Sequence, residues 1–163
     1  MDLILFDLDM TLVDTSALEA LRSSKKWKSI KKSLNLTNVY PGILMLLEHL
    51  RKEYSVVVVT SSPRGYAEAI LNYHELKITN IIAYHDTKNH KPDPEPLIKA
   101  IKKYSDDYAK VLHIGDEIVD IQAAYKAKVY KSYLALWGGI DPKNLSDIKI
   151  PYQTVETPQQ LLE

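Results

Sequence analysis

Cysteine is absent from this sequence of 163 residues, which excludes a thiolate nucleophile, a disulfide framework and any metal site with thiolate ligands. An excess of one charge is also lacking. The 21 Lys and Arg residues balance 21 Asp and Glu residues, which argues against a globally basic nucleic-acid binder or an acidic tail protein. Long hydrophobic runs are missing as well, since acidic residues interrupt the N-terminal MDLILFDLD. We therefore expect a soluble, cytoplasmic protein with no membrane partner.

The hydrophobic residues that are present make up 45% of the chain, enough for the core of one globular domain. They fall into short β-prone runs, and these predict strands at residues 3–6, 56–59, 81–84, 111–114 and 129–136. The runs lack the in–out alternation of a half-exposed antiparallel sheet, so we expect buried parallel strands. Stretches of helical spacing between them predict helices at residues 43–53, 63–74, 94–104 and 118–127. This alternation predicts an α/β fold, a parallel sheet with helices on both faces.

Two segments depart from the alternation. Residues 15–38 are predicted to form a short helical insert, with Ser16 as a candidate helix cap and Glu19 three positions later. Residues 138–158 are predicted to be a loop-rich return that leads into a short last helix. We therefore divide the chain into a core of residues 1–14 and 39–163 and an insert of residues 15–38.

The insert carries a run of basic residues without an acidic one: Arg22, Lys25, Lys26, Lys28, Lys31 and Lys32. A charge run on a helix is usually a solvated face, and the alternative is a surface that attracts polyanionic substrates. Trp27 and Ile30 lie between the basic residues, and we expect both to pack against the core.

Polar side chains follow four of the five predicted strands, at the edge of a parallel sheet where ligands bind. In chain order they are Asp7 and Asp9, Thr60 to Ser62, Lys91 in the loop after the third strand, and Asp116, Glu117 and Asp120. So many carboxylates repel one another unless a cation lies among them. Oxygen ligands at this density suit Mg²⁺ better than a soft metal.

Phosphoryl transfer is the chemistry that needs this set of side chains. Asp7 can act as the nucleophile and form an aspartyl phosphate, while Asp9 can protonate the leaving alcohol and later activate water. Thr60 and Ser61 can hold phosphoryl oxygens, and Lys91 supplies a fixed positive charge. The sequence therefore predicts a phosphohydrolase that acts on a phosphorylated small molecule.

Four segments, in the right order, resemble the motifs of haloacid dehalogenase (HAD) superfamily hydrolases. They are DLDMT at residues 7–11, VVVVTSS at 56–62, KPDPEPL at 91–97 and GDEIVD at 115–120. YPGI at 40–43, DIQAA at 120–124 and the pair Trp137-Gly138 resemble the phosphoglycolate-phosphatase-like branch. The resemblance implies a three-layer Rossmann-like fold and the catalytic roles given above. It also implies a magnesium site made by Asp7, Asp116 and the backbone carbonyl of Asp9, supported by Asp120.

The sequence departs from this branch in two ways. Met10 stands where the branch commonly has glycine, which affects the local turn. The helical cap that relatives insert after the first motif is reduced here to residues 15–38, so we expect an open site. No family role is assigned to Glu117. His85 and His90 flank the Lys91 loop and are candidates for substrate contact.

Three alternatives to a phosphatase are weighed. A dehalogenase is disfavoured because the dehalogenases that this chain resembles lack an aspartate at the position of Asp9. A phosphoacceptor of the response-regulator type is disfavoured because it takes its phosphate on the third strand, whereas Asp7 follows the first. A catalytically silent domain that binds phosphorylated partners stays open, although the presence of Asp9 argues against it.

Overall fold

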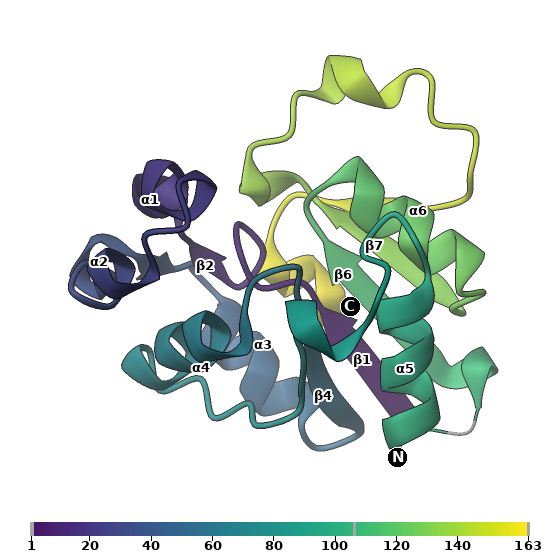
Figure 1. Ribbon diagram of the computed structural model, residues 1–163. Coiled ribbons are helices and arrows are strands. Elements are labelled where there is room, and N and C mark those ends of the chain that lie inside the picture. Colours follow the sequence, from purple (N-terminus) through teal and green to yellow (C-terminus); the bar gives the residue numbers. More distant parts are fainter. Residues whose placement is uncertain (1, 106, 163) are drawn as a thin grey trace.

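The computed structural model describes residues 2–105 and 107–162 and shows a six-stranded sheet in the order β5-β4-β1-β6-β7-β8 (Figure 1). The strands are β1 (Asp2–Phe6), β4 (Tyr54–Val59), β5 (Ile81–Ile82), β6 (Val111–Gly115), β7 (Lys131–Ala135) and β8 (Gln153–Val155). Every pair of neighbouring strands in this sheet is parallel. This arrangement confirms the predicted α/β fold class.

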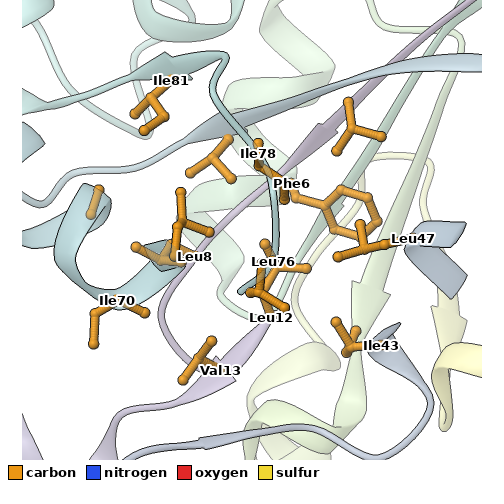
Figure 2. Close-up of a cluster of buried hydrophobic side chains, with 14 of the residues drawn as sticks. Phe6, Leu8, Leu12, Val13, Ile43, Leu47, Ile70, Leu76, Ile78 and Ile81 are labelled. Atoms are coloured by element: carbon orange, nitrogen blue, oxygen red, sulfur yellow. The ribbon is translucent and has the colours of Figure 1, made fainter. Parts of the chain in front are cut away.

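Helices cover both faces of the sheet. They are α3 (Ile43–Leu50), α4 (Arg64–Tyr73), α5 (Glu95–Tyr104) and α6 (Ile118–Lys126). Successive side chains of β1 point to opposite faces. Phe6 packs in a cluster with Ile43 and Ile70 (Figure 2), whereas Leu5 packs in a second cluster with Leu97 on the other face. Burial on both faces explains why the strand sequences are continuous apolar runs instead of alternating ones.

The C-terminal segment differs from the prediction. Residues 153–155 form β8, which pairs with β7 at the edge of the sheet, whereas the sequence predicts a loop-rich return over residues 138–158 and no strand there. Val155 is buried, but Gln153 and Thr154 are exposed, so the strand carries too short an apolar pattern to be recognised. The expected last helix is a 3-10 helix, η7 (Pro158–Leu162). The predicted third strand is also shorter, since Tyr84 begins the 3-10 helix η3 (Tyr84–Asp86).

The insert begins and ends on a small antiparallel pair, β2 (Val13–Asp14) and β3 (Asn38–Val39). Between them lie η1 (Ser16–Leu18), α1 (Glu19–Ser23), α2 (Trp27–Lys31) and η2 (Leu34–Leu36), at one side of the molecule (Figure 1). The expectation that Ser16 caps a helix is wrong. Its backbone N–H and its hydroxyl both donate to the carboxylate of Asp14, at 3.0 and 2.6 Å.

The inner side of the insert packs on the core, as expected for Trp27 and Ile30. The Trp27 ring lies 5.6 Å from the ring of Tyr66 on α4, and Ile30 is buried. Among the described residues, no helix is both long and apolar enough to cross a membrane.

Candidate active site

The predicted site residues meet at the carboxyl ends of β1, β4 and β6. A cavity of about 140 Å³ is lined by the seven residues that the sequence singled out for catalysis, substrate or metal: Asp7, Asp9, Thr60, Ser61, Lys91, Asp116 and Asp120. These residues come from four separate segments of the chain, and the parallel sheet brings them together because its central strands end at the same edge.

Lys91 is the more deeply buried of the two cations that line this cavity. Its Nζ lies 2.7 Å from Oδ1 of Asp7 and 2.6 Å from Oδ1 of Asp120. Burial opposes the charged form, but the two carboxylates outweigh it and raise the pKa of Lys91. The ammonium group therefore stays charged between the two carboxylates.

Three carboxylates gather around one point. Oxygen atoms of Asp7, Asp116 and Asp120 lie within 4.8 Å of one another. Burial, assisted by the neighbouring carboxylates, raises the pKa of Asp7 to about 7 and that of Asp116 to about 9. A hard cation with oxygen ligands at about 2.0–2.6 Å spans such a group and removes the repulsion between its charges. The all-oxygen donor set thus fits a divalent metal ion.

Asp9 lies in a different environment. Its Oδ1 accepts hydrogen bonds from the hydroxyls of Thr15, at 2.8 Å, and Tyr66. Its Oδ2 accepts from Ser62, at 3.0 Å, and pairs with Arg22, at 3.1 Å. The Asp9 carboxylate is therefore held by four donors and does not belong to the three-carboxylate group, so a metal contact from Asp9 would have to use its backbone carbonyl.

The loop that carries Asp9 depends on tight backbone contacts. Met10 has a φ of 62°, in the left-handed region that side chains rarely adopt and that favours glycine. The Trp137 indole N–H donates to the carbonyl of Thr11 at 2.9 Å, and the Thr11 hydroxyl donates to Asp116 at 2.9 Å. A Cβ on Gly138 would lie only 2.4 Å from the Cβ of Asp116, so no larger residue fits there.

Comparisons with known proteins identify the family. The sequence matches the family model described as haloacid dehalogenase-like hydrolase over residues 17–132. The chain belongs to this family. It is 32% identical over 136 residues to the N-acetylmuramic acid 6-phosphate phosphatase of Pseudomonas aeruginosa, an alignment that covers 81% of this chain and 59% of the relative. It is 29% identical to the phosphoglycolate phosphatase of Aquifex aeolicus, with 100% of this chain and 96% of the relative covered.

A solved structure of a hydrolase from Pseudomonas syringae has the same fold. It superposes with a TM-score of 0.84 at 26% identity and covers 99% of this chain and 96% of that one. The chain spans only part of the length of two other relatives. It covers 59% of the N-acetylmuramic acid 6-phosphate phosphatase of Pseudomonas aeruginosa and 49% of that of Pseudomonas putida.

Several contacts within this candidate site of the haloacid dehalogenase-like chain were not predicted from the sequence. Thr11, Thr15 and Tyr66 all donate to site carboxylates, yet none was singled out. Thr11 is the last residue of the DLDMT motif, so the sequence offered a reason to expect it near the site. Tyr66 lies on the buried face of α4, where an aromatic residue is expected simply as part of the core. The sequence pattern therefore gives no indication that Tyr66 contacts the site.

The basic run divides into two parts in the structure. Arg22 lines the cavity of the predicted site residues and a second cavity of about 500 Å³ beside it. The five lysines of the run are exposed and line neither cavity. His85 is exposed, His90 stacks on Tyr84 with ring centroids 3.9 Å apart, and neither lines these two cavities.

Proposed function

We propose that this protein is a magnesium-dependent phosphatase that hydrolyses a phosphomonoester through an aspartyl phosphate on Asp7. The observation that carries the proposal is the single cavity in which Lys91 faces Asp7 and Asp120 while Asp116 completes a three-carboxylate group. The family assignment and the printed names of the relatives, which are phosphatases, support it.

The first half-reaction transfers the phosphoryl group to the protein. An oxygen of the Asp7 carboxylate attacks phosphorus, and the bond between phosphorus and the ester oxygen breaks. Asp9 gives its proton to the departing oxygen, which leaves as an alcohol. Lys91 and the hydroxyl of Thr60 hold the phosphoryl oxygens, and Ser61 lies beside them in the same cavity.

The second half-reaction releases phosphate. Asp9, now a carboxylate, takes a proton from water as the water oxygen attacks phosphorus, and the bond to Asp7 breaks. When held by the carboxylates of Asp7 and Asp116 and by the backbone carbonyl of Asp9, with Asp120 in support, Mg²⁺ would supply positive charge next to the phosphoryl oxygens. Inorganic phosphate leaves, and Asp7 returns to its original state.

We also propose separate roles for the core and the insert. Residues 1–14 and 39–163 form the catalytic core, and residues 15–38 form a small cap that contributes Arg22 to the site.

The candidate substrates include N-acetylmuramic acid 6-phosphate and phosphoglycolate, after which relatives are named. Both compounds carry a carboxylate on the alcohol that would leave.

The experiment that tests the proposal is the release of inorganic phosphate from a panel of phosphate esters in the presence of Mg²⁺. We expect turnover of p-nitrophenyl phosphate and of at least one candidate substrate, and none by the Asp7→Asn variant. Phosphate release by Asp7→Asn at the wild-type rate would refute the mechanism. The absence of release from every ester would favour the alternative, a domain that binds phosphorylated ligands without turning them over.

A further inference from the structure

The two oxygen atoms of the Asp9 carboxylate differ in their partners. Oδ1 accepts hydrogen bonds from the hydroxyls of Thr15, at 2.8 Å, and Tyr66. Oδ2 accepts from the hydroxyl of Ser62, at 3.0 Å, and pairs with Nη2 of Arg22, at 3.1 Å. A carboxylate offers about four lone-pair positions, so these donors occupy all of them. One contact must therefore give way before Asp9 exchanges a proton with a substrate or with water.

The two oxygen atoms also differ in their access to the site. Ser62 and Arg22, the partners of Oδ2, both line the cavity of about 140 Å³. Thr15 and Tyr66, the partners of Oδ1, are 0% and 3% exposed and line neither this cavity nor the one of about 500 Å³. Oδ2 is therefore the oxygen atom that a substrate can reach by displacing a partner. Oδ1 is the oxygen atom that the protein interior holds.

Tyr66 is itself held in place by the cap. Its ring lies 5.6 Å from the ring of Trp27 on α2, and Cζ of Arg22 on α1 lies 5.6 Å from its centroid. The hydroxyl of a tyrosine lies on the axis of its ring, so packing of the ring also fixes the hydroxyl. Burial and the negative charge of Asp9 raise the pKa of Tyr66, so the hydroxyl keeps the proton that it donates.

We infer that Tyr66 is a positioning residue that holds Oδ1 of Asp9 so that Oδ2 faces the leaving oxygen of the substrate. The inference rests on the proposed function, because it takes Asp9 as the acid and base of the reaction. In the first half-reaction the proton leaves Oδ2 for the ester oxygen, and in the second Oδ2 takes a proton from water. A displacement of about 1 Å costs up to about 100-fold in rate, so the orientation of Asp9 matters. Tyr66 thus acts through Asp9 without touching the substrate.

The test compares two aryl esters that differ in how much the leaving group needs a proton. Phenyl phosphate releases a phenol whose pKa is about 10, as for a tyrosine side chain, whereas the nitro group of p-nitrophenyl phosphate stabilises the departing phenolate. Tyr66→Phe removes the hydroxyl and keeps the ring that packs on Trp27. We expect this variant to lower kcat/KM about tenfold or more for phenyl phosphate and less than about threefold for p-nitrophenyl phosphate. An equal decrease for both esters, or no decrease for either, would overturn the inference.

Three further variants separate positioning from a general loss of structure. Tyr73→Phe removes a hydroxyl from an exposed position on the same helix and should leave both values of kcat/KM unchanged. Thr15→Val removes the other donor to Oδ1 at nearly constant size and should change the ratio of the two esters in the same direction as Tyr66→Phe. In the Asp9→Asn background, Tyr66→Phe should slow the cleavage of phenyl phosphate no further, because Asp9 no longer gives a proton. A further tenfold decrease in that background would contradict an action through Asp9.

The phosphoryl protein gives a second readout that a structural role would not change. Tyr66→Phe should also slow the second half-reaction, in which Asp9 takes a proton from water, so more of the protein should carry phosphate during turnover of p-nitrophenyl phosphate. Mass spectrometry of the acid-quenched protein measures this fraction, and a fraction no larger than in the wild type would count against the inference. A wild type that hydrolyses neither ester would refute the proposed function itself. An active wild type whose Tyr66→Phe variant keeps the same ratio of the two esters would refute only the role of Tyr66.

Discussion

The Nζ atom of Lys91 lies 2.7 Å from Oδ1 of Asp7, and only 4% of the lysine side chain is exposed. This contact places a permanent positive charge against the candidate nucleophile. It also leaves Asp7 and Asp120 dependent on the lysine, because the structure buries their charges together.

Replacement of Lys91 by methionine should therefore affect both activity and stability. We expect loss of phosphate release and a decrease of about 3–5 kcal/mol in the free energy of unfolding without metal, because two buried carboxylates lose their partner. Mg²⁺ should restore part of the stability, since it compensates the same charges. Urea unfolding with and without Mg²⁺ measures both effects. Lys88→Met, at an exposed position in the same loop, is the control, and an equal loss in both variants would contradict the pairing argument.

Removal of the metal should abolish activity and change the pH dependence of stability. The pKa values of Asp7 and Asp116, raised to about 7 and about 9, mean that the metal-free folded protein holds protons that the unfolded chain has lost. The stability of the metal-free protein should therefore fall as pH rises from 6 through 9. Stabilisation by Mg²⁺ should grow over the same interval, because binding requires the deprotonated carboxylates.

Thermal unfolding with Mg²⁺ or with EDTA, at several pH values, measures this difference. A shift in the midpoint that shrinks between pH 6 and pH 9 would contradict the assignment of the metal to these carboxylates. Full phosphatase activity in excess EDTA would exclude the metal from the reaction.

Asp7 and Asp9 should differ when each is replaced by asparagine. Asp7→Asn removes the nucleophile, whereas Asp9→Asn removes the proton donor but leaves attack on phosphorus possible. We expect both variants to turn over substrate at least about 100-fold more slowly. Only Asp9→Asn should accumulate a phosphoryl protein from p-nitrophenyl phosphate, whose leaving group needs no proton. Mass spectrometry of the quenched protein locates the phosphate, and its presence on any residue other than Asp7 would contradict the mechanism.

The sequence predicts the central part of this molecule because the relevant signals are local. Each central strand is a continuous apolar run, and the polar residue that follows it is fixed at the same sheet edge by the parallel topology. Asp7 and Asp116 could therefore be placed near each other although they lie far apart in the chain.

Features that depend on the reach of a side chain could not be predicted in this way. Arg22 contacts Asp9 because the cap folds back so that Trp27 packs on Tyr66. Arg22 is the one arginine of the basic run, but the sequence does not show that it alone reaches the site. The strand at residues 153–155 has a single buried residue, so its pairing with β7 depends on the sheet that it joins and not on its own pattern.

His113 is expected to limit stability in mild acid. The residue lies on β6, is 1% exposed, and its Nδ1 is 3.0 Å from the hydroxyl of Ser132. Burial lowers the pKa of His113 to about 4, although the charge of Asp120 acts in the opposite direction. An unfolded histidine titrates near ~6.5, so the unfolded chain binds a proton that the folded protein excludes.

The sign of this effect follows from the two pKa values. The neutral His113 contributes its full stability above about pH 6.5, and this contribution is lost as the pH falls toward 4. Between pH 7 and pH 5 the loss should be about 2 kcal/mol in the free energy of unfolding. His113→Asn keeps a polar atom near Ser132 but cannot titrate. Between pH 7 and pH 5 the free energy of unfolding of this variant should therefore fall by about 2 kcal/mol less than that of the wild type. Any cost of the smaller side chain is the same at every pH and does not affect this difference. Urea unfolding at pH 7, 6 and 5, with the exposed His85→Asn as the control, gives the comparison. Parallel pH curves for the wild type and His113→Asn would show that His113 takes up its proton in the folded state as easily as in the unfolded chain.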